Sequence, residues 1–153
     1  VTLDPETAHA HLALSRDLRG ARWEPSRQPL RDSPARFDAS RCVLGRPAFA
    51  AGSHYWEVAV AAGSAWAVGV AKESVRRKGK VSMNPQGGIW AVGRCGGRYQ
   101  ALTAPATDLP VAPEVIGVFL DYEAGVVAFA DAASPEPFFS FQAAAFGGER
   151  VLP

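Results

Sequence analysis

Apolar and polar residues alternate strictly along several short segments of the chain. Between residues 54 and 60, every second side chain is apolar or aromatic, and those between them are polar or small. A period of two is typical of a β-strand with one buried face. The predicted core face carries His54, Trp56, Val58 and Val60, and the opposite face carries Tyr55, Glu57 and Ala59.

The same period returns in two further segments, residues 66–71 and 89–95. We expect their tryptophans in the core, since aromatic side chains bury the most surface. Small residues then occupy the outer face of both strands. Ala-Gly-Ser at 62–64 predicts a turn that makes antiparallel neighbours of the first two strands. The small outer residues are Ala67, Gly69 and Ala71 in one strand, and Ala91, Gly93 and Cys95 in the other.

Short apolar segments separated by turn residues make up most of the remaining chain. The 15 glycines and 12 prolines suit frequent turns, and no long amphipathic helix is evident. About ten to twelve strands predict an all-β fold, an antiparallel two-sheet β-sandwich. Asp4-Pro5 predicts a short N-terminal helical turn. Further strands are expected at 12–15, 42–44, 98–102, 115–120, 126–130 and 138–141, and long loops at 23–34 and 103–114.

Composition narrows the class of protein. A chain of 153 residues with 48% hydrophobic residues fits one domain with a real core. The net charge of +1 argues against a general binder of DNA or anionic membranes and gives RNA binding little support. No apolar run is long enough to span a membrane, and the first residues do not resemble a secretory signal. Cys42 and Cys95, far apart in the chain, are interpreted as reduced thiols of a cytoplasmic protein.

Candidate catalytic residues are few. The chain lacks the common nucleophile, metalloprotease and phosphate-loop motifs, and no spacing typical of metal ligands occurs. His9 and His11 are expected to be solvent-exposed. A Cys95–His54 dyad is the remaining enzymatic alternative, although neither residue has an activating neighbour in sequence. The sequence therefore predicts no enzyme, no metal and no cofactor.

One dense basic cluster lies between residues 76 and 80. Its simplest interpretation is a solvated loop, and the alternative is an anion-binding patch. The candidate residues of that patch are Arg76, Arg77, Lys78 and Lys80.

Several segments, taken in order, resemble the PRY–SPRY domain of tripartite-motif ubiquitin ligases and butyrophilin tails. They include LDPETA near the start, HYWEV at 54–58, KESVRRKGK at 72–80 and LDYEAG at 120–125. The resemblance covers the whole chain, with a PRY part at about 1–50 and a SPRY part at about 51–153. It implies a concanavalin-like jelly roll with short N-terminal helical turns.

The resemblance also implies a function. Family members recognise proteins or peptides and are not enzymes, since ligase activity belongs to a separate RING domain. We therefore expect a substrate-targeting module of a tripartite-motif ligase, with a role in innate immunity. The alternative is a butyrophilin-type cytoplasmic domain that senses a phosphorylated small molecule through the basic patch.

In this family, partners bind a shallow groove formed by one outer sheet face and variable loops. Small residues at the matching positions of this chain predict an open floor that accepts a partner side chain. The candidate residues are Ala67, Gly93 and Cys95 on the floor, Arg94, Arg98 and Gln100 beside it, and Arg31 and Ser33 on the rim loop.

The resemblance further implies one more strand after Pro153. Without that strand, a sheet edge and apolar surface would be left uncovered, which predicts self-association through the edge.

Overall fold

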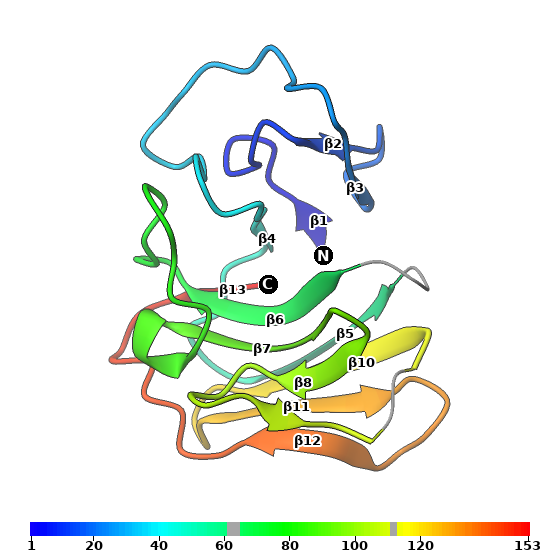
Figure 1. Ribbon diagram of the computed structural model, residues 1–153. Coiled ribbons are helices and arrows are strands. Elements are labelled where there is room, and N and C mark those ends of the chain that lie inside the picture. Colours follow the sequence, from blue (N-terminus) through cyan, green and yellow to red (C-terminus); the bar gives the residue numbers. More distant parts are fainter. Residues whose placement is uncertain (61–64, 111–112) are drawn as a thin grey trace.

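The computed structural model describes residues 1–60, 65–110 and 113–153, and Figure 1 shows its strands arranged mainly in two layers. The first layer is a five-stranded antiparallel sheet in the order β13-β6-β7-β8-β9. The turn predicted at 62–64 lies outside the described residues. The antiparallel pairing predicted for the segments on either side of it was wrong, because residues 54–60 and 66–71 belong to different sheets. The strands are β6 (Trp66–Lys72), β7 (Ile89–Cys95), β8 (Arg98–Ala101), β9 (Thr107–Asp108) and β13 (Val151–Leu152).

The second layer is a four-stranded antiparallel sheet in the order β12-β11-β10-β5. Its inner face packs on the first sheet, and buried side chains from both form one core. The predicted all-β sandwich is confirmed. Its strands are β5 (Ser53–Ala59), β10 (Val115–Asp121), β11 (Val126–Asp131) and β12 (Pro137–Phe141).

Strand β5 follows the predicted alternation. Trp56 pairs with Val118 of β10 and packs against the core, whereas Tyr55 is exposed. His54 faces the same side as Trp56. Its ring stacks on Phe49 at 3.9 Å between centroids, and its Nε2 is hydrogen-bonded to the Ala51 carbonyl at 2.7 Å. The side chain of His54 therefore has a structural partner.

The N-terminal segment adds two small antiparallel sheets. The pair β1 (Thr2–Leu3) and β4 (Gly45–Arg46) forms one, and β2 (Leu12–Leu14) and β3 (Ala21–Trp23) form the other. Figure 1 shows this segment, blue to cyan, stacked on the β6 side of the sandwich.

A second apolar cluster joins the N-terminal segment to the outer face of β6 and β7. Phe37 and Leu44 pack there with Ala71, Ile89 and Ala91, all of them buried. Part of the small-residue face predicted to be open is therefore covered by the chain itself. The part left open lies toward the start of β6 and the end of β7.

Local predictions in the N-terminal segment were partly wrong. The strand expected at 42–44 does not form, and β4 begins at Gly45 instead. At the predicted N-terminal helical turn, the Asp4 carboxylate accepts a hydrogen bond from the Glu6 amide at 3.0 Å, but only a hydrogen-bonded turn follows. The one 3-10 helix among the described residues is η1 (Pro85–Gly87). Within the described residues, no helix is long and apolar enough to cross a membrane.

His9 was expected to be exposed, and this prediction was wrong. Only 4% of its surface is accessible, because the segment around Phe37 and Cys42 closes over it. Its Nδ1 accepts from the His11 amide at 3.0 Å. Burial lowers the pKa of His9 below its usual 6.5.

Candidate functional site

A row of directly opposed residues crosses four strands on the outer face of the five-stranded sheet. Ala67 of β6 is opposite Gly93 of β7, Gly93 is opposite Gln100 of β8, and Gln100 is opposite Asp108 of β9. Cys95 and Arg98 form the neighbouring pair. The register therefore brings five of the predicted residues together on one face, on the side opposite Trp66 and Trp90.

The centre of this face is almost bare backbone. A Cβ atom at Gly93 would lie 2.6 Å from the Trp66 carbonyl oxygen and 3.2 Å from the Ala67 Cβ, too close for any real side chain. Gly93 is buried between its neighbours, whereas Ala67 and Cys95 are exposed. A partner can therefore approach the sheet closely beside Ala67.

Polar side chains border this bare strip on the β8 and β9 side. The Arg98 Nη2 lies 3.2 Å from both carboxylate oxygens of Asp108, and the Gln100 amide donates to the same carboxylate at 3.3 Å. Arg98 and Asp108 are both exposed, so their ion pair contributes only about 0.2–1 kcal/mol. A partner can therefore replace this ion pair with its own contacts at little cost in free energy. Asp108 was not among the predicted site residues, because its place beside Gln100 depends on the β8–β9 pairing.

Arg94 does not belong to this face. It is opposite both Trp66 and Tyr99, on the core-facing side of the sheet. Its guanidinium carbon lies 5.2 Å from the centroid of the Tyr99 ring, a cation–π distance. Its grouping with the floor residues was wrong, since alternation sends it to the other side of β7.

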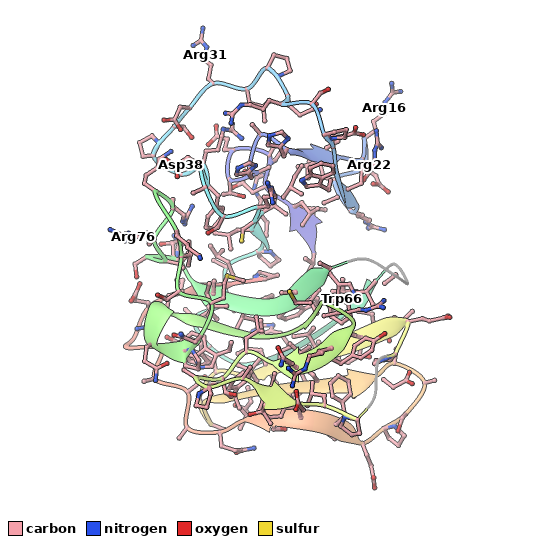
Figure 2. All side chains as sticks on the ribbon, in the orientation of Figure 1. Arg16, Arg22, Arg31, Asp38, Trp66 and Arg76 are labelled. Carbon is pink, nitrogen blue, oxygen red and sulfur yellow. The ribbon has the colours of Figure 1, made fainter. Side chains whose placement is uncertain are left out.

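The rim loop lies elsewhere. The Lys78 ammonium donates to the Asp32 carboxylate at 2.6 Å and to the carbonyls of Ser33 and Arg36 at 2.7 and 2.9 Å. These bonds hold the end of the loop against residues 73–84. Figure 2 shows Arg31 at the far tip of the N-terminal segment, well apart from Trp66 at the start of β6. Arg31 and Ser33 are therefore not brought to the Ala67 face.

Two residues of the basic cluster, Arg77 and Lys78, are engaged within the fold. Arg77 donates to the carbonyls of Ala35, Glu73 and Val75 at 2.7–3.1 Å, and its guanidinium lies over the Phe37 ring. Lys78 is bonded as described above. Arg76 and Lys80 are exposed, and Figure 2 shows Arg76 pointing away from the molecule. An anion bound by all four residues would have to break these bonds, so the patch as predicted has no support here.

The Cys95–His54 dyad does not assemble. Cys95 ends β7 on the outer face of one sheet, whereas His54 lies on β5 of the other sheet and stacks on Phe49. The other thiol, Cys42, is partly buried, and burial raises its pKa and disfavours the reactive thiolate.

Two family models match the chain along its length. The SPRY-associated (PRY) domain matches residues 1–49, and the SPRY domain matches residues 53–153. The chain belongs to the SPRY family. SPRY domains are protein-binding modules rather than enzymes.

Similar proteins come from two groups. This SPRY domain is 48% identical to "Butyrophilin subfamily 1 member A1" of Bos taurus and 47% identical to "Zinc finger protein RFP" of Homo sapiens. Each match covers 97% of the chain but only 28% and 29% of the respective relative. The chain thus spans less than a third of the length of these curated relatives.

Solved structures share the fold. A crystal structure of the TRIM65 PSpry domain matches with a TM-score of 0.81 and 25% identity, over 99% of this chain and 80% of that one. The stonustoxin structure matches equally well in TM-score, at 26% identity and over 24% of its chain.

Proposed function

We propose that this SPRY domain recognises a protein or peptide through the outer face formed by Ala67, Gly93, Cys95, Arg98, Gln100 and Asp108. The observation that supports it is a strip of small residues beside an exposed, weakly bound charged pair. Small residues let a partner's backbone or side chain reach the sheet. The adjoining carboxylate, guanidinium and amide then offer both donors and acceptors for orientation.

Substitution of Ala67 by tryptophan tests the proposal. Ala67 is exposed and its Cβ points outward, so the large side chain fills the face without entering the fold. Gly93→Trp is unsuitable, because its Cβ would collide with the Trp66 carbonyl and disturb the sheet. Ala124→Trp, an exposed alanine in the turn between β10 and β11, is the matched control.

The measurement is comparative affinity capture. Partners retained by the wild-type domain and by Ala124→Trp, but lost with Ala67→Trp, support this face, and their affinity should fall by at least about tenfold. Partners that bind all three proteins equally place the binding site on another surface.

We further propose that recognition serves substrate targeting by a tripartite-motif ligase in the cytoplasm, with a role in innate immunity. The similarity to zinc finger protein RFP supports this setting, and that to butyrophilin supports the alternative of a butyrophilin tail. The coding sequence upstream separates the two: a RING domain favours the ligase, and an immunoglobulin ectodomain with a membrane span favours the butyrophilin.

A further inference from the structure

The outer face of the second sheet contains a groove of about 580 Å³. Its floor is made of small residues, among them Gly117, Ala128 and Ala130. Tyr55 and Phe119 stand on one side, and the turn at 132–137 lies along the other. This groove and the Ala67 face lie on different sheets, so a partner bound to one surface leaves the other surface uncovered.

The aromatic side of the groove is held in place by the fold. Tyr55 and Phe119 are directly opposed across β5 and β10, with 55% and 38% of their surfaces exposed. The Tyr55 ring lies over Gly117, where an added Cβ would come within 2.6 Å of the Tyr55 hydroxyl. That hydroxyl donates to the Glu57 carboxylate at 2.8 Å. A fixed ring loses little conformational freedom when a ligand stacks on it.

Charge is unevenly divided between the segments that form the second sheet and the rest of the molecule. Residues 53–59 and 114–148 hold the whole second sheet and contain six carboxylates but no lysine or arginine, a net charge of −6. The rest of the chain carries all 16 basic residues and the other nine carboxylates, a net charge of +7. Because Glu57 and Asp121 share the outer face with Tyr55 and Phe119, the groove lies in an acidic field.

We propose that this groove binds an extended, positively charged peptide segment of a partner protein, with prolyl or aliphatic side chains against Tyr55 and Phe119. A shallow groove on a sheet face leaves a small molecule exposed, whereas an extended peptide contacts its whole length. Aromatic rings suit proline and also guanidinium groups. Glu57 and Asp121 supply the complementary charge for lysine or arginine in the peptide.

The test is a selection of displayed random peptides on the immobilised 153-residue protein. Enriched peptides should combine arginine or lysine with proline or aliphatic residues, and their binding should weaken as salt is added. Their affinity should fall about tenfold in Phe119→Ala and in Glu57→Lys. Glu6→Lys, at an exposed carboxylate of the N-terminal segment that belongs to neither surface, is the matched charge control and should leave binding unchanged.

Three results would overturn the proposal. The first is a selection in which the folded protein enriches no peptides, or only acidic peptides, relative to a parallel selection on the unfolded protein. The second is loss of binding in Glu6→Lys but not in Phe119→Ala. The third is self-association of the wild-type protein by sedimentation, abolished in Phe119→Ala, since this face would then be covered by a second copy.

Discussion

The imidazole of His9 shows how a single buried polar group can set a pH dependence. Burial lowers its pKa, and Nδ1 is already engaged as an acceptor from the His11 amide, so the folded protein favours the neutral ring. Between the folded pKa and about 6.5, the unfolded chain binds more protons than the folded one. The free energy of unfolding should therefore fall as the pH drops through 6.5 and level off below the folded pKa.

Urea unfolding at several pH values from about 7.5 to 5.5 measures this dependence. The variant His9→Asn keeps a side-chain acceptor for the His11 amide but cannot titrate in this range. Its stability should vary less with pH than that of the wild type. An unchanged pH dependence in His9→Asn would assign the effect to other groups.

Gly93 is a residue whose importance comes from what it lacks. In Gly93→Ala, the new Cβ would press on the Trp66 carbonyl across the β6–β7 ladder, and we expect a loss of about 1–3 kcal/mol in unfolding free energy. Gln100→Ala, opposite Gly93 on β8, should change stability by less than about 0.5 kcal/mol. Equal effects in thermal or urea unfolding would show that the β6–β7 spacing adapts to the methyl group.

Among the elements, the longer strands of the sandwich and β2 could be predicted from sequence, whereas β3, β4 and the two-residue strands β9 and β13 could not. Strand β5 alternates over seven residues, so its inner and outer faces follow from period two. Strands β3 and β4 contain three and two residues, too few for any period to emerge. The pairing of β4 with β1 also depends on contacts between distant parts of the chain, such as the Gly45 amide with the Pro153 carbonyl.

The connection between β6 and η1 illustrates why neighbouring charges differ in role. Arg77 links this connection to the carbonyl of Ala35, whereas Arg76 is exposed. In Arg77→Met, three carbonyls lose a charged hydrogen-bond donor. We therefore expect the free energy of unfolding to fall by about 2–3 kcal/mol and amide hydrogen exchange in residues 31–37 to become faster.

Arg76→Met is the matched control for this element. Its free energy of unfolding should stay within about 0.5 kcal/mol of that of the wild type, and its amide hydrogen exchange should be unaltered. Equal exchange rates in the two variants would mean that Lys78 alone holds the loop.

At the scale of the whole molecule, the sandwich and the small-residue strip could be inferred from alternation, but the surfaces around them could not. Nothing local indicates that Phe37 and Leu44 cover Ala71 and Ala91, because that contact joins segments far apart in sequence. The place of Asp108 beside Gln100 was missed for another reason: residues 103–114 were expected to form a loop, whereas β9 forms there and pairs with β8. The basic cluster divides into the exposed Arg76 and Lys80 and the bonded Arg77 and Lys78, because charge density does not show which side chains carbonyls will surround.

The two-sheet core should hold the molecule together as one cooperative unit, and two phenylalanines on paired strands test this. Phe129 of β11 is fully buried between the sheets and contacts Phe141 edge-on, whereas Phe119 of β10 is partly exposed on the outer face. Phe129→Ala should lower the free energy of unfolding by about 3–5 kcal/mol, since it leaves a cavity in the core. Phe119→Ala should cost under about 1.5 kcal/mol, because its ring is already partly in water.

Urea unfolding followed by both tryptophan fluorescence and circular dichroism checks this pair of variants. Trp66 and Trp90 lie on the first sheet and Trp56 on the second. A shared core therefore requires one fluorescence transition that coincides with that of circular dichroism, at a lower urea concentration in Phe129→Ala. Separate transitions would mean that the sheets unfold independently. A large loss in Phe119→Ala would mean that the outer aromatic pair supports the fold itself, which would leave it less free to serve a partner.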